Sequence, residues 1–323
     1  MSPVRFVPDG GMRKPKLGLT WTERALLRLM SLRRGACRRL RERWNAEYAI
    51  FSDHFAVPVW KFLALERCRA DVSTLVLGSS HAYYGYFAER NEFNLADVSC
   101  DFRLASALLG YWLSRGLPAL RRVVLFYDDF GPGNVLEKSS EVYRMIPYVR
   151  LYGMEIGSHR SDTNLYLSYD DLCAAFDRGM RRFRPIVDDG YRGNFGYGFR
   201  PYKSPQGILE KRVRGHLKLN SGEECVHIAR MIADLKALGI RLTLVMPPLR
   251  EDYRSLLPKD RGVLFRALWR TGISPQDIEF VDLLDSSLFT SGDFNDMDHL
   301  NENGARKLSA CVRTSANKGG VHA

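Results

Sequence analysis

The sequence has few features of a secreted, disulfide-bonded or membrane-spanning protein. Its six cysteines are scattered, with no CxxC pair and no Cys/His cluster, which argues against a disulfide framework and a structural zinc site. The longest apolar stretches, such as residues 104–113, fall short of the roughly 20 residues that cross a bilayer. The first residues contain no apolar segment followed by a small-residue cleavage site. We therefore expect a protein of the reducing cytoplasm.

Acidic residues are scarce at the N-terminus, where residues 1–50 carry twelve Lys/Arg against four Asp/Glu. Within residues 21–46, apolar side chains recur at roughly helical spacing and arginines cover the other faces. Such a basic amphipathic helix could lie on an anionic membrane, pack on the main domain or touch nucleic-acid phosphates. No nucleic-acid-binding motif accompanies it. We therefore expect no nucleic-acid partner, and peripheral contact with the inner face of a membrane stays an alternative to packing.

Beyond about residue 60, short aliphatic runs alternate with longer helical patterns, which is typical of a parallel sheet covered by helices. This predicts a flavodoxin-like three-layer α/β/α sandwich with a five-stranded, mainly parallel sheet in the order 2-1-3-4-5. The expected strands are residues 73–78, 92–96, 121–128, 241–247 and 279–283, and the clearest helices lie within 102–116, 169–183, 221–239 and 302–316. The expected organisation is a basic extension (1–60), an α/β domain (61–315) with an insert at about 130–220, and a flexible tail (316–323).

Two serines and a histidine follow the first expected strand, in the segment LVLGSSH that ends at His81. Ligands of open α/β sheets bind beyond the carboxyl ends of the strands, so Ser80 would be displayed where a reactive group is needed. A serine is a weak nucleophile unless a base accepts its proton and a third group orients that base. Ser79 and Ser80 could instead cap the helix that follows.

A matching base and acid occur in DMDHLNENGA, just before the last expected helix. In a tight loop, the carboxylate of Asp296 can reach back to Nδ1 of His299 and leave Nε2 free. We expect Asp298 to point the other way, and Asp293 remains a second candidate for orienting His299. The inert alternative is that the aspartates are turn and cap residues.

The combination of LVLGSSH after the first strand and DMDH before the C-terminal helix resembles the SGNH (GDSL-like) hydrolase superfamily. More narrowly, it looks like the bacterial branch that accompanies surface-polysaccharide biosynthesis. The resemblance implies that Ser80 is the nucleophile and that Asp296 and His299 are its acid and base. It also implies that no metal or other resident cofactor is required.

The sequence departs from the family pattern at the oxyanion hole, the set of N–H donors that stabilises the developing oxyanion. In the family, a glycine in the second sequence block offers its N–H to the oxyanion, but the end of the second expected strand has no glycine here. No GxND-like loop follows the third strand. Asn94 or Asn134 could serve together with the Ser80 backbone N–H, and we favour Asn94 because it lies at a strand end. His81 could line the pocket as a further donor or make a structural hydrogen bond.

A segment rich in aromatic residues and glycine, DDGYRGNFGYGFRPYK, occupies residues 188–203. Aromatic faces with nearby polar groups suit sugar rings, so Tyr197 and Phe199 are candidate substrate contacts, as are His81 and Tyr83. The aromatics could equally anchor a long surface insertion.

The serine, histidine and aspartate predict serine-dependent chemistry, and the resemblance implies a carbohydrate esterase or O-acyltransferase, acetyl being the expected group, that acts on a bacterial glycan or its precursor. A transferase would need a donor such as an acyl-CoA, for which no motif is present. The alternative is a catalytically inactive SGNH-like adaptor of polysaccharide biosynthesis at the membrane surface.

Overall fold

The computed structural model describes residues 16–19, 50–157, 163, 165, 167–195 and 206–317. Its centre is a five-stranded sheet in which every neighbouring pair is parallel, in the order β3-β2-β4-β6-β7. The strands are β2 (Thr74–Leu77), β3 (Glu92–Asn94), β4 (Arg122–Phe126), β6 (Arg241–Met246) and β7 (Glu279–Asp282). The five expected strands and their order 2-1-3-4-5 are therefore confirmed.

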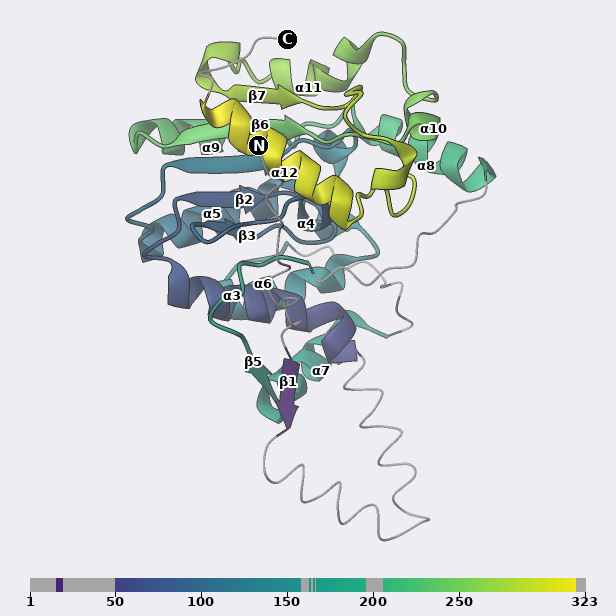
Figure 1. The fold of residues 1–323 in the computed structure, drawn as a ribbon. Helices are drawn as coiled ribbons and strands as arrows, with labels where there is room; N and C mark the ends of the chain where they lie inside the picture. Colours follow the sequence, from purple (N-terminus) through teal and green to yellow (C-terminus); the bar gives the residue numbers. More distant parts are fainter. Residues whose placement is uncertain are drawn as a thin grey trace, which may run out of the picture.

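Helices cover both faces of the sheet and make three layers (Figure 1). One face carries α5 (Phe102–Arg115) and α9 (Val226–Ala237), and the other carries α4 (Ser80–Gly85) and α12 (Glu302–Asn317). Because successive strand residues point to opposite faces, one strand can contribute side chains to the cores on both sides of the sheet. In β4, Val123 and Leu125 join the α5/α9 side, whereas Val124 and Phe126 join the α4/α12 side.

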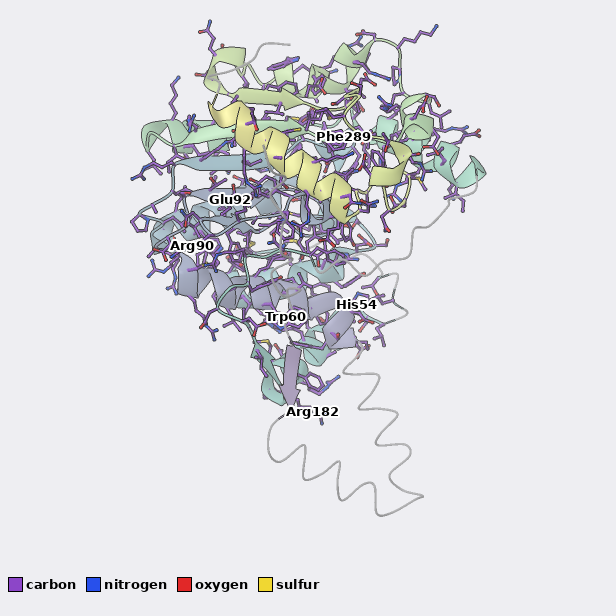
Figure 2. All side chains as sticks on the ribbon, in the orientation of Figure 1. His54, Trp60, Arg90, Glu92, Arg182 and Phe289 are labelled. Atoms are coloured by element: carbon purple, nitrogen blue, oxygen red, sulfur yellow. The ribbon has the colours of Figure 1, made fainter. Side chains whose placement is uncertain are left out.

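A third core lies beside the sheet, below it in Figure 1, between α3 (Ala56–Cys68), α6 (Ile146–Tyr152) and α7 (Tyr169–Arg182). The short π-helix η1 (Phe51–Phe55) inserts two phenylalanine rings into it, and Phe51 lies 5.9 Å from Phe176 between ring centroids. The packed core thus reaches back to Phe51, ahead of the domain boundary expected at residue 61. In Figure 2, Trp60 lies on α3, whereas Phe289 of the other core lies beside α12.

The remaining elements are short apart from the helix α8. A two-stranded antiparallel sheet pairs β1 (Lys16–Leu19) with β5 (Phe183–Ile186). The helical segments are η2 (Gly131–Gly133), η3 (Leu136–Lys138), η4 (Val142–Met145), α8 (Gln206–Leu219), α10 (Glu251–Arg254), η5 (Arg261–Phe265), α11 (Arg266–Trp269), η6 (Pro275–Asp277) and η7 (Ser291–Asp293). Within the described ranges, no helix combines the length and the apolar character needed to cross a membrane. The basic segment 21–46 lies outside the described residues.

The close packing of α7 against Phe51 predicts the effect of a single methyl group. A Cβ at Gly179 would lie 2.1 Å from the Phe51 ring, so Gly179→Ala should lower the free energy of unfolding by about 1–3 kcal/mol. Gly215→Ala on α8 is the matched control, since a Cβ there meets nothing within 4 Å and a helical alanine should be neutral or stabilising. Urea unfolding of both variants is the measurement, and equal stability would contradict the packing described.

Candidate active site

In the turn after β2, the side chains of Ser79 and Ser80 make different contacts. Gly78 has φ of +135°, and a Cβ there would lie 2.9 Å from the Cβ of Phe126, so only glycine fits this turn. Ser79 is the N-cap of α4: its hydroxyl accepts from the His81 N–H at 3.4 Å and donates to the Asp128 carboxylate. Ser80 is the first residue of α4, and its hydroxyl is therefore not needed as the cap.

The loop before α12 brings the expected acid and base to Ser80. His299 Nε2 lies 2.8 Å from Ser80 Oγ, and its Nδ1 lies 2.8 Å from Asp296 Oδ2. The other oxygen of Asp296 accepts from the backbone N–H groups of Asp298 (3.0 Å) and His299 (2.8 Å). The three side chains are only partly buried. Residues 219 positions apart in the chain thus form a continuous hydrogen-bonded row.

The row is arranged to keep Asp296 ionised. Burial by itself would raise the pKa of Asp296, but the hydrogen bond and charge of His299 and the two backbone N–H donors hold it well below its usual range. A charged Asp296 fixes the proton of His299 on Nδ1. The Nε2 atom is then free to accept the Ser80 proton, which is the tautomer that nucleophilic catalysis requires.

The prediction that Asp298 points away from His299 is wrong. Asp298 is 1% exposed, and its Oδ1 lies 3.3 Å from His299 Nδ1. Its Oδ2 lies 2.9 Å from Nε of Arg212, which reaches in from α8. Asp293, the other candidate, instead accepts hydrogen bonds from Thr290 and pairs with Lys307 at 2.8 Å, so it does not orient His299.

His81 lies behind the row and not on its open side, so its expected contact with substrate is not supported. Both ring nitrogens are buried. Its Nδ1 lies 2.9 Å from Asp128 Oδ1, and its Nε2 lies 3.9 Å from Asp298 Oδ2. Burial opposes the charged form, but attraction by Asp128 first, and then by Asp298 and Asp129, raises the pKa of His81 to about 9. His81 is therefore an imidazolium at neutral pH.

A second buried carboxylate at the end of β4 is held by its own partners. Asp129 accepts a hydrogen bond from the Tyr253 hydroxyl at 2.7 Å, and His216 Nδ1 lies 3.4 Å away. Burial would raise the pKa of Asp129, but His216 and Tyr253 lower it below the usual value. Of these two adjacent residues, Asp128 therefore faces His81 on α4, whereas Asp129 faces His216 on α8 and Tyr253 on α10.

Tyr84, which was not among the expected substrate contacts, lies beside His299. The Tyr84 ring lies 5.0 Å from that of His299 and 4.9 Å from that of Phe195. Tyr84 is four residues after Ser80 on α4, and this i,i+4 spacing could have revealed it in the sequence. Tyr83 is 6% exposed and packs against Lys61 and Phe195, so it is mainly a core residue. The other two candidates, Tyr197 and Phe199, lie outside the described residues.

Of the two expected oxyanion donors, the Ser80 backbone N–H and the Asn94 amide, only the first is available. Asn94 is fully buried, and its amide donates to the backbone oxygens of Ala82 (3.0 Å) and Tyr86 (2.8 Å), so the prediction that it faces an oxyanion is wrong. The amide of Asn134 donates to the Ser99 carbonyl at 3.3 Å. The N–H of Ser80, at the start of α4, has no hydrogen-bond partner in the described part of the chain. It is the donor best placed for an oxyanion.

Among the described residues, one group of side chains could in principle hold a metal ion. Single ligand atoms of His81, Asp298 and His299 all lie within 4.8 Å of one another. However, Arg212 already places its positive charge 2.9 Å from Asp298, and His81 is itself positively charged. A divalent cation would have to displace both charges and break the bond between His299 and Asp296, so the donor set does not suit a resident metal.

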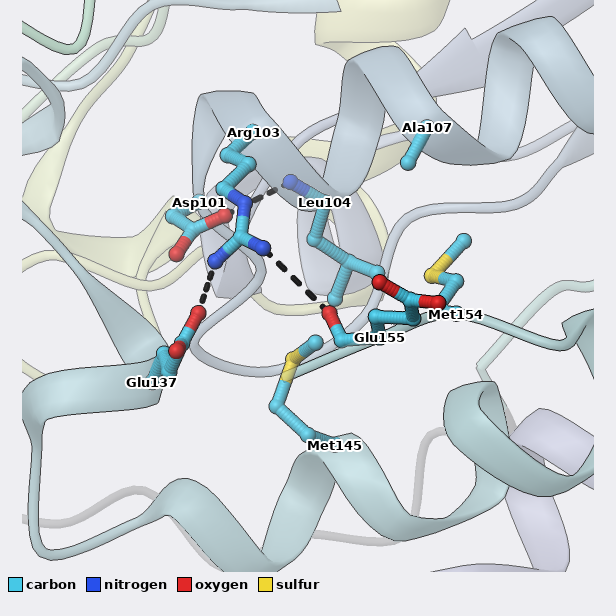
Figure 3. Close-up of a pocket in the computed structure, with 8 residues that line it drawn as sticks. All are labelled: Asp101, Arg103, Leu104, Ala107, Glu137, Met145, Met154 and Glu155. Carbon is cyan, nitrogen blue, oxygen red and sulfur yellow. Dashed lines mark hydrogen bonds and ion pairs between the residues drawn. The ribbon is translucent and has the colours of Figure 1, made fainter. Parts of the chain in front are cut away.

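A separate pocket of about 260 Å³ lies between α5 and the segment 145–155 (Figure 3). Leu104, Met145 and Met154 give it apolar walls. Three of its charged groups already have partners: Arg103 pairs with Glu137, and Asp101 accepts from the backbone of Leu104 and Leu136. The pocket contains no residue of the Ser80 row, so we do not assign a ligand to it.

Comparison with known families gives no further guide to the chemistry. No family model matches the chain, and no curated protein matches it.

The charge of His81 predicts a specific pH dependence of stability. Because its pKa is about 9 in the folded protein against 6.5 ordinarily, its contribution is fully present below pH 6.5 and is lost as the pH rises through 9. The contribution is at most roughly 3 kcal/mol. His81→Gln should therefore remove a decline in stability between pH 6.5 and 9, measured by urea unfolding.

Lys61, whose pKa burial lowers to about 7, acts in the opposite sense over this range, so the effect of His81→Gln is read as the difference in slope from wild type. A second histidine variant is the control for the substitution itself. Burial lowers the pKa of His227 below 6.5, so His227→Gln should leave the slope between pH 7 and 9 unchanged. If His81→Gln retains the wild-type slope, His81 is not the buried cation described.

Proposed function

We propose that the protein is a serine-dependent esterase or O-acyltransferase of the SGNH type that acts on acylated glycans. The observation that carries the proposal is the row Ser80–His299–Asp296, with both side-chain distances at 2.8 Å. The motifs LVLGSSH and DMDH supply the resemblance to that superfamily. They occupy the carboxyl edge of a parallel sheet, where open α/β proteins bind their ligands.

In the first half of the proposed reaction, Ser80 Oγ attacks the carbonyl carbon of an acyl ester while His299 Nε2 accepts the hydroxyl proton. The negative charge moves to the carbonyl oxygen, where the Ser80 N–H stabilises it. The charge of Asp296 stabilises the imidazolium that forms. The intermediate collapses by breaking the bond to the alcohol oxygen, and His299 returns its proton to that oxygen. The product is an alcohol and an acyl-Ser80.

In the second half, the acceptor repeats the same steps in reverse. His299 takes a proton from water or from a sugar hydroxyl, the acceptor oxygen attacks the acyl carbonyl, and the proton returns to Ser80. Water as acceptor makes the protein an esterase. A sugar hydroxyl makes it a transferase, for which an acyl-CoA is a suitable donor. Tyr84 beside His299, and Phe195 beside Tyr84, offer aromatic faces of the kind that stack on sugar rings.

The row predicts a reactive serine that a fluorophosphonate probe should label. Labelling of wild type should be stoichiometric by intact mass, absent in Ser80→Ala, and abolished or strongly reduced in His299→Ala. Asp296→Asn should slow labelling by roughly 10³-fold or more, because the histidine then adopts the wrong tautomer. Ser114→Ala on α5, an exposed serine, is the matched control and should label normally.

Two results would reject the enzyme: labelling that persists in Ser80→Ala, or a folded wild type that neither labels nor hydrolyses an activated acetyl ester. If the serine is reactive, acetylated sugars incubated with and without an acyl-CoA distinguish release of acetate from transfer. An inert protein would favour the adaptor function, whose working part is the basic segment 21–46.

We further propose that this segment brings the protein to the cytoplasmic face of an anionic membrane. Full-length protein should bind vesicles containing phosphatidylserine, bind purely zwitterionic vesicles weakly, and dissociate as salt is raised. Replacing Arg33, Arg34, Arg38 and Arg39 by glutamine should remove about 1 kcal/mol of binding per charge. The control replaces four exposed arginines of the body, Arg90, Arg214, Arg230 and Arg270. Absence of wild-type binding to the anionic vesicles would refute the contact.

A further inference from the structure

The positive charges around Asp298 form a second layer behind the proposed catalytic row. Asp298 is buried, and it faces His299 Nδ1 at 3.3 Å, Arg212 Nε at 2.9 Å and His81 Nε2 at 3.9 Å. Neither of its oxygens makes a hydrogen bond of good geometry with a described residue. Asp298 is therefore held mainly by charge, and its neighbours decide how strongly its own charge is felt by His299.

We propose that Arg212 and His81 are positioning residues that neutralise Asp298 and so keep His299 available as a base near neutral pH. This inference rests on the proposed function of His299. It assigns Arg212, which lies on a helix that no motif had connected to the site, to control of the pH range of the reaction.

The need for neutralisation follows from the number of carboxylates at one nitrogen. His299 Nδ1 has Asp296 at 2.8 Å and Asp298 at 3.3 Å. A carboxylate this close to an imidazole favours the protonated ring, and two such carboxylates favour it more than one does. A protonated imidazole cannot accept the Ser80 proton. A cation on Asp298 removes the excess.

Arg212 is suited to this task by its position. Its side chain is 35% exposed, whereas Asp298 is covered, so the guanidinium extends from the surface to the buried oxygen. The nearby Arg250 cannot replace it, because its guanidinium pairs with both oxygens of Asp252 and donates to the backbone oxygen of Asp296. His81 faces the same oxygen of Asp298, Oδ2, at the longer distance of 3.9 Å, and it also pairs with Asp128.

The polar and charged groups that surround His299 and Asp298 come from five parts of the fold. They are Asp296 in the same loop; Ser80, His81 and Tyr84 on α4; Asp128 and Asp129 after β4; Arg212 and His216 on α8; and Arg250 and Tyr253 at α10. Among them, Arg212 and Asp298 can be exchanged for neutral residues of similar shape without removing a member of the proposed catalytic row.

The test is a pH titration of the His299 ring by ¹⁵N–¹H NMR in the full chain, with its signals assigned by their loss in His299→Gln. Arg212→Gln should move the titration midpoint to higher pH, and Asp298→Asn should move it to lower pH. The double variant should return close to wild type. Arg212→Lys should restore most of the midpoint. Arg214→Gln, the same charge change on the same helix, should shift nothing.

Opposite shifts distinguish charge from packing, because a purely structural role would give shifts of no fixed sign. Midpoints that coincide in wild type, Arg212→Gln and Asp298→Asn would overturn the inference, as would shifts in the same direction. The readout does not depend on activity. If the midpoints move as expected while the fluorophosphonate probe fails to label Ser80, the proposed function fails and the electrostatic coupling stands.

Discussion

Four buried carboxylates at one edge of the sheet impose the constraint on which the site depends. Asp97, Asp128, Asp129 and Asp298 are each at most 7% exposed, and an unpaired charge in such a position is too costly to keep. Each has recruited a partner from another element: Tyr148 from α6, His81 from α4, Tyr253 from α10 and Arg212 from α8. Satisfying these charges ties together the segments that surround Ser80.

The same constraint explains why neighbouring, chemically similar residues act differently. Ser79 is committed to the cap of α4 and to Asp128, which leaves the Ser80 hydroxyl for His299. Asp296 receives backbone donors and stays near the open side, whereas Asp298, two residues later, turns inward to Arg212. In each pair, one residue is buried and holds neighbouring segments in place, and the other stays partly exposed beside His299.

The sheet and the convergence of Ser80, Asp296 and His299 could be predicted because alternating hydrophobic patterns and short motifs are local in sequence. The directions of Asp298 and Asn94 could not, since they depend on partners such as Arg212 and Tyr86 that no local pattern reveals. The helix α3 was missed because it is apolar on most sides and contains Pro58, which hides a helical period. Tyr84 was missed although its spacing from Ser80 was visible.

The proposed nucleophile and its base are far apart in the sequence. Ser80 follows the first strand of the sheet, and His299 precedes the last helix, so the hydrogen bond between them closes a loop of 219 residues. During synthesis, the β2–α4 turn emerges early, but its hydroxyl stays without a base until α12 has docked on α4. Under the proposed function, a nascent chain therefore carries an unreactive serine until the segment that contains His299 has been synthesised and has reached α4.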